Sequence, residues 1–371
     1  MRLAVGADST GEYRASGLFA TTAITDELVI AGAGDGTVTL ESAAPLRASA
    51  AILGSATGGL GILRLFENAL VNLAEPAPSE GATLAPGFLE VGKNSNGLVE
   101  LFDEGTTVHC LEAILGGASV DAGGTVNVDT GATFTCDGSV SVGNSAGAGL
   151  LRVANGGNVE VGSQLLVGAR GLVVAGAGAN VQSSFVSNGR IQILLEVTIP
   201  RPEEKSGAAS KKGVPTGPVV IEGDLVLEEG GVLEIEAGAE SMLQVGGNAT
   251  LAGTLRIALV PGRVYGDDVL SQLASFGGTV EGAFAAIEFV NAPEGFDAAV
   301  TIENGELILD IQSDGVGGEG EGEGEGEGEG EGEGEGEGEG EGEGEGEGEG
   351  EGEGEGEGEG EGEGEGEGEG Q

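Results

Sequence analysis

The two cysteines of the chain, Cys110 and Cys136, are the residues with the clearest capacity for chemistry. They close two copies of one pattern, GTTVHC at residues 105–110 and GATFTC at residues 131–136. A thiol pair can fill an apolar interior or form a disulfide. A four-ligand metal site is not expected, because His109 would point to the opposite face of a strand. Two interpretations stay open: buried free thiols, or a disulfide between repeats that requires an oxidising compartment.

Three aspartates and the single histidine are the remaining candidates for catalysis. Asp121, Asp129 and Asp137 are spaced eight residues apart, and an extended chain spans about 26 Å over that length. We therefore expect them to open three separate turns and not to share a metal ion or a substrate. A Ser-His-Asp device would need His109, which has no acidic residue two positions away. We predict no catalytic, cofactor-binding or metal-binding residues, and hence no enzyme.

The composition argues against several other functions. The formal net charge is −50, and residues 319–370 are a strict Glu-Gly alternation; without its 26 glutamates the charge is −24. Such an acidic chain is a poor partner for nucleic acid or an anionic membrane surface. No apolar run reaches the roughly 18 residues of a membrane span. No cofactor is expected, since the unorganised carboxylates of the tail would bind calcium no more tightly than about 10⁻³ M.

The cysteine pattern belongs to a longer repeat. Its last apolar position recurs with a period near 25 once a 12-residue insertion, residues 75–86, is left out. Within each period, apolar and polar residues alternate over short runs such as GTVNV, which predicts strands, and turn residues follow about every eight positions. The equivalent positions are Ala48, Leu73, Cys110, Cys136, Val161 and Ser183.

A repeat of this length with about three short strands predicts a β-solenoid. We expect an all-β fold, most simply a parallel right-handed β-helix with about 25 residues per rung. Equivalent residues of successive rungs then lie about 4.8 Å apart, so Cys110 and Cys136 are predicted neighbours.

The sequence predicts five parts along the chain. We expect a short helix at Asp267–Ser275, within the C-terminal cap. The five parts are a weakly patterned segment at residues 1–27, β-solenoid repeats at 28–197, a linker or loop at 198–218, further β rungs and a β-rich C-terminal cap at 219–312, and a disordered Glu-Gly tail at 313–371.

Several repeat units resemble those of secreted bacterial autotransporter-type and PEP-CTERM-associated proteins. The units are FLEVGKNSNGLVELFDEGTTV, VSVGNSAGAGLLRVANGGNVEV and QLLVGARGLVVAGAGANV, and the likeness covers about residues 28–190. The stretch around Gly282–Phe284 is similar to the closing segment of such proteins. The resemblance implies export and an extracellular or cell-surface role. It carries no catalytic residues that could be transferred.

We therefore expect a non-enzymatic, secreted or cell-surface β-solenoid that acts as a structural, adhesive or extracellular-matrix module, with the acidic tail as a flexible spacer. The sequence does not identify a binding partner. The candidate partners are extracellular polysaccharide and the cell envelope. The alternative is a carbohydrate-active β-helix enzyme, a polysaccharide lyase or hydrolase. Residues 1–17 lack the apolar stretch of a secretory signal. Because the resemblance implies export, this leads to the hypothesis that the chain is a fragment.

Overall fold

The computed structural model describes most of the chain before the Glu-Gly tail. The chain divides into two compact units, residues 1–318 and 319–371, and every described residue belongs to the first. The predicted insertion and the predicted disordered tail lie outside the described residues. The described residues are 1–4, 6, 9–16, 22–42, 45–73, 87–117, 119–202, 216–238, 242–260, 269–294 and 296–312.

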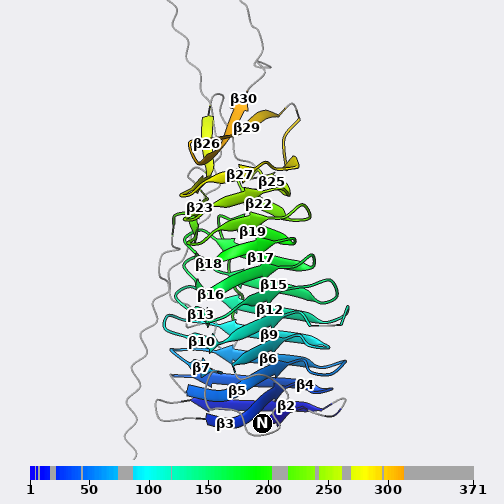
Figure 1. The fold of residues 1–371 in the computed structure, drawn as a ribbon. Coiled ribbons are helices and arrows are strands. Elements are labelled where there is room, and N and C mark those ends of the chain that lie inside the picture. Colours follow the sequence, from blue (N-terminus) through cyan, green and yellow to red (C-terminus); the bar gives the residue numbers. More distant parts are fainter. Residues whose placement is uncertain are drawn as a thin grey trace, which may run out of the picture. The chain divides into compact units, whose positions relative to one another are not determined.

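The described residues form an all-β fold of strands and turns, with no helix among them (Figure 1). One sheet, called sheet B, has 11 strands, and each pairs in parallel with the next strand of that sheet along the chain. Sheet B consists of β2 (Thr10–Ser16), β4 (Asp35–Glu41), β6 (Leu60–Leu65), β9 (Asn96–Leu101), β12 (Gly123–Val128), β15 (Ala148–Val153), β17 (Gly171–Gly176), β19 (Arg190–Leu194), β22 (Val232–Glu236), β25 (Thr254–Ala258) and β28 (Ala286–Val290).

The other sheet, called sheet A, has 19 strands and receives two short strands from most turns of the chain. Along the chain, for example, the β10 and β11 strands of sheet A come after β9 and before β12 of sheet B. Sheet A consists of β1 (Arg2–Leu3), β3 (Thr22–Ile30), β5 (Pro45–Leu53), β7 (Leu70–Asn72), β8 (Phe88–Val91), β10 (Thr107–Cys110), β11 (Glu112–Leu115), β13 (Thr133–Cys136), β14 (Val140–Val142), β16 (Asn158–Val167), β18 (Asn180–Ser187), β20 (Val219–Ile221), β21 (Leu225–Leu227), β23 (Leu243–Val245), β24 (Ala249–Leu251), β26 (Val269–Phe276), β27 (Val280–Gly282), β29 (Asp297–Glu303) and β30 (Glu306–Gln312).

The strand register follows the sequence repeat. Cys110 of β10 pairs with Cys136 of β13, and Cys136 pairs with Val161 of β16, as the repeat predicts. Side chains of a strand alternate between its two faces, and here one face is buried and the other half-buried, as in the β12 and β15 strands. The buried faces of both sheets meet in one aliphatic core that extends along the stack. This arrangement is consistent with a β-solenoid.

Glycines at equivalent corners let the chain turn from sheet A into sheet B. Gly92, Gly116 and Gly143 follow the ends of β8, β11 and β14, and all three have positive φ, at 77°, 85° and 65°. A Cβ atom on Gly92 would lie 2.4 Å from the carbonyl oxygen of Gly123 on the next turn of the chain. A side chain there would therefore be strained and would also separate stacked turns.

An antiparallel hairpin covers the sheet A edge at the C-terminal end of the stack. The β29 and β30 strands pair with each other, and β30 also pairs antiparallel with β26. Asn304 and Gly305 join them with φ of 51° and 80°, the positive values that a two-residue type I′ hairpin turn requires. The predicted helix at Asp267–Ser275 is wrong. Residues 269–276 form β26, because Leu273 and Ala274 are buried in the core and Ala274 pairs with Leu243.

Candidate functional site

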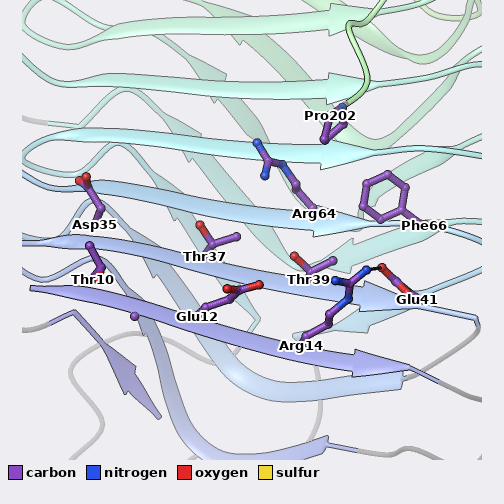
Figure 2. A pocket seen from close by; sticks show the side chains of 11 residues that line it. Thr10, Glu12, Arg14, Asp35, Thr37, Thr39, Glu41, Arg64, Phe66 and Pro202 are labelled. Atoms are coloured by element: carbon purple, nitrogen blue, oxygen red, sulfur yellow. Dashed lines mark hydrogen bonds and ion pairs between the residues drawn. The ribbon is translucent and has the colours of Figure 1, made fainter. Parts of the chain in front are cut away.

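A polar cleft of about 600 Å³ lies on the outer face of sheet B, over β2, β4 and β6 (Figure 2). Strand alternation positions its side chains: Arg14 pairs in register with Thr39, which pairs with Arg64, so the three form one column across neighbouring strands. The residues that line the cleft are Thr10, Gly11, Glu12, Arg14, Asp35, Thr37, Thr39, Glu41, Arg64, Phe66 and Pro202.

Ion pairs between strands fix the two arginines of the cleft. Arg14 Nη2 lies 2.7 Å from Glu41 Oε1, and Arg64 Nε lies 2.8 Å from Glu100 Oε2. The carboxylates are the more buried partners, with side chains 11% exposed at Glu41 and 8% at Glu100, against 48% at Arg14 and 29% at Arg64. The guanidinium groups therefore keep outward-facing donors in a defined position while the carboxylates anchor them.

The remaining polar groups of the cleft are hydroxyl groups and carboxylates. Thr37 and Thr39 place two hydroxyl groups on the floor, and Glu12 and Asp35 supply carboxylates near them (Figure 2). Asp35 Oδ1 also accepts a hydrogen bond from the Leu60 amide at 2.9 Å, which ties β4 to β6. Hydroxyl, carboxylate and guanidinium groups together can hydrogen-bond a hydroxyl-rich ligand. The described lining holds no histidine, cysteine or lysine to act as a nucleophile or as its base.

A strap, defined here as residues 195–202, leaves sheet B after β19 and packs against earlier turns of the chain. Asn155 holds its start from both sides: its Nδ2 donates to the Leu195 carbonyl oxygen at 3.0 Å, and its Oδ1 accepts from the Val197 amide at 2.7 Å. Ile199 is buried further along, in a small cluster separate from the main core. That cluster consists of Phe66, Phe102, Ala154 and Ile199.

Arg201 anchors the end of the strap beside the cleft. Its Nη2 lies 2.8 Å from Asp103 Oδ1 and 2.9 Å from Asp129 Oδ2, and its guanidinium carbon lies 5.2 Å from the centre of the Phe102 ring. Burial lowers the pKa of Arg201, but the hydrogen bonds to the two aspartates outweigh this effect and raise the pKa above its usual value. The next residue, Pro202, is thereby placed in the wall of the cleft (Figure 2).

The two cysteines lie together inside the stack, away from this cleft. Both are buried on the inner face and both are free thiols in this structure. Cys110 Sγ donates to the Thr135 carbonyl oxygen at 3.6 Å, and Cys136 Sγ donates to the Leu111 carbonyl oxygen at 3.4 Å. A hydrogen bond between the thiols raises the pKa of Cys110 well above its usual value and lowers that of Cys136.

His109 has an acidic partner that the sequence analysis missed. Its Nε2 lies 3.1 Å from Asp137 Oδ1 on the outer face of sheet A. His109 pairs with Thr135, and Asp137 follows two residues later on that face, so the repeat register itself was the available signal. His109 and the inward-facing Cys110 occupy opposite faces of β10, so they form no thiol–imidazole pair.

The three aspartates considered for metal binding occupy different surroundings. Asp121 is exposed in a turn, Asp129 binds Arg201, and Asp137 contacts His109. Within the described ranges, no group of three or more His, Cys, Asp or Glu side chains could hold a metal ion. The same residues include no helix long and apolar enough to cross a membrane.

Comparison with known proteins adds no family. No family model matches the chain, and no similar curated protein was found.

Proposed function

We propose that this protein is a non-enzymatic β-solenoid that serves as a structural and adhesive module outside the cell or at its surface. The observation that carries the proposal is the uninterrupted stack of parallel strands over one aliphatic core. Eleven strands of sheet B at about 4.8 Å per strand make a rod about 48 Å long. A rod of this kind holds surface groups at fixed spacing, which suits a scaffold.

The proposed architecture is a right-handed parallel β-helix with about 25 residues per rung and a disordered Glu-Gly spacer. The right hand rests on the strong preference for right-handed crossovers between parallel strands. The rung length is supported by the pairing of Cys110 with Cys136 and of Cys136 with Val161. The spacer rests on composition, because alternating glutamates repel one another and glycine favours the unfolded chain.

The adhesive role is assigned to the cleft on sheet B, with a polysaccharide as the partner. Its floor and walls offer hydroxyl, carboxylate and guanidinium groups held in place by neighbouring strands. A polymer of hydroxyl-rich units could bind there through several weak contacts. The similarity of the repeat units to autotransporter-type and PEP-CTERM-associated proteins supports a location outside the cell, where such polymers occur.

A carbohydrate-active enzyme is the second candidate, and one observation favours it. Glu12, Asp35 and Glu41 line the same cleft, and paired carboxylates are the usual machinery of glycoside hydrolysis. Against this, Glu41 is held by Arg14 at 2.7 Å and Asp35 accepts from the Leu60 amide. These two carboxylates therefore already have structural partners.

Binding of the full chain to insoluble polysaccharides tests the proposal. The probes are cellulose, chitin and a polyuronate gel, and the readout is the fraction of protein retained. The double variant Thr37→Val/Thr39→Val removes two hydroxyl groups from the cleft floor without changing side-chain shape. Loss of two hydrogen bonds of about 1 kcal/mol each predicts roughly tenfold or greater weakening of binding.

The matched control is Thr125→Val/Thr254→Val, which changes half-buried threonines on the same face of sheet B, outside the cleft. Its retention should equal that of the unmodified protein. Failure of the unmodified protein to bind any of the three polymers would remove the adhesive role. Release of soluble oligosaccharides from a retained polymer would replace it with the enzymatic alternative.

A further inference from the structure

The inner faces of β10 and β13 bring the only two thiols of the chain together. Cys110 and Cys136 are partners in a parallel pair, so their Cα atoms lie about one strand spacing apart, roughly 4.8 Å. Disulfides join Cα atoms about 4.4–6.8 Å apart. Both side chains are buried on the same inner face, at 0% and 1% exposure. Two thiols in this position face each other within a fixed frame.

The surroundings offer these thiols little besides each other. Val108 and Phe134, two residues earlier on the same strands, are fully buried neighbours in the same core, and Val161 follows Cys136 in register on the next turn of the chain. Besides each other, the two sulfur atoms contact main-chain carbonyl oxygens. A metal is not indicated, because the described residues provide no further ligands there.

Cys136 is the thiol-bearing residue that borders the outer surface of sheet A. A cavity of about 260 Å³ on sheet A is lined by Cys136 together with the outward-facing Thr135 and Glu160. The hydrogen bond from Cys110 lowers the pKa of Cys136, which increases the share of its reactive thiolate form. We assign Cys136 as the thiol that reacts first because it borders this cavity, and Cys110, its register partner on β10, as the thiol that resolves the intermediate.

We propose that Cys110 and Cys136 are a site of oxidative cross-linking, at which a disulfide joins two successive turns of the solenoid. The oxidant is a low-molecular-weight disulfide. The Cys136 thiolate attacks one sulfur of that disulfide, whose S–S bond breaks and releases one reduced thiolate. Cys110 then loses its proton and attacks Cys136 Sγ, releasing the second reduced thiolate. The protein loses two protons and two electrons, and the donor disulfide becomes two thiols.

The cross-link encloses the 26-residue interval from Cys110 to Cys136. It would hold β10 against β13 and reduce the freedom of the unfolded chain, which raises stability. The proposal rests on the thiol geometry alone and is independent of the cleft on sheet B. An oxidising location outside the cell, as in the proposed function, would allow the bond to persist.

The test uses the full chain, incubated folded in oxidised glutathione and, in parallel, in dithiothreitol. After denaturation, free thiols are counted by alkylation and intact mass. In oxidised glutathione, the number of alkylatable thiols should fall from two to none and the monomer mass should fall by two hydrogens. The midpoint of thermal unfolding should rise. A persistent glutathione adduct, a cross-linked dimer or two thiols still free would each overturn the proposal.

A matched variant retains two thiols but separates them. In Cys136→Val/Val161→Cys the thiols lie two strand spacings apart, about 9.6 Å, beyond the reach of a disulfide. This variant should keep both thiols after the same treatment, and its unfolding midpoint should not respond to oxidant. Cross-linking of this variant at the rate of the unmodified protein would mean that the bond forms in unfolded chains, against the proposal.

Discussion

At the scale of a single residue, Arg201 ties the end of the strap to two earlier turns of the chain. It satisfies Asp103 and Asp129 together and lies over the Phe102 ring, and its side chain is only 13% exposed. Arg201→Ala would leave two partly buried carboxylates without their cation. We expect a loss of about 1–3 kcal/mol in the free energy of unfolding, measured by urea denaturation.

The comparison for that measurement is Arg2→Ala. The Arg2 side chain is 65% exposed and lies 4.0 Å from Glu27, a weak surface pair, so its removal should cost less than about 1 kcal/mol. Equal losses for the two variants would contradict the assignment of Arg201 as an anchor.

Contacts between equivalent positions of successive repeats could be predicted from the sequence. Contacts between non-equivalent positions of successive repeats were harder to predict. The spacing of Cys110 and Cys136 predicted their pairing, because one period of a solenoid is one strand spacing in space. The His109–Asp137 contact joins non-equivalent positions, because Asp137 lies two residues beyond Thr135, the register partner of His109. A search for acidic residues limited to the strand of His109 therefore missed it.

At the scale of an element, the strap at residues 195–202 depends on one buried side chain. Ile199 is 7% exposed and packs in the cluster with Phe66 and Phe102. Ile199→Ala should weaken this packing by ~2 kcal/mol or more. The strap should then open locally, and the Val197 amide, which donates to Asn155, should exchange its hydrogen about 30-fold faster.

Hydrogen exchange followed by NMR or mass spectrometry measures this change. Ile302→Ala supplies the control, because Ile302 is 36% exposed on β29, and it should leave exchange in the strap unaltered. Unchanged exchange at Val197 in the Ile199 variant would show that the strap is held by its polar contacts alone.

The strap shows why some packing contacts could not be predicted from the sequence. Residues 198–218 were predicted as a linker or loop from their composition. Residues 198–202 pack on the stack without forming a strand, and residues 203–215 lie outside the described ranges. The signal was two phenylalanines, Phe66 and Phe102, each directly after a sheet B strand, where several other turns of the chain carry a small or polar residue such as Ser42, Asp129 or Ala154. Such outward apolar residues need a cover that strand periodicity does not reveal.

At the scale of the whole first unit, a solenoid must protect the edges of its end strands. A parallel stack presents unpaired amides and carbonyls at each end, and such edges attract other chains. The β29–β30 hairpin protects part of one end by pairing with β26 in the opposite direction. Asn304 and Gly305 form the kind of turn that is a strong hairpin signal in sequence. A C-terminal cap is expected here from the sequence, but this turn is not among the predicted elements.

Detaching the hairpin should therefore cause self-association. Leu309 of β30 is fully buried, and Leu309→Asp would place a charge in the core at a cost of several kcal/mol. We expect the hairpin to leave the stack and expose the edge of β26, giving oligomers that grow with protein concentration in sedimentation velocity. Ile302→Asp adds the same charge on the exposed part of the same hairpin and should remain unassociated. Association of both variants would mean that the hairpin surface itself causes self-association. Association of neither variant would mean that β30 is not needed to protect the edge of β26.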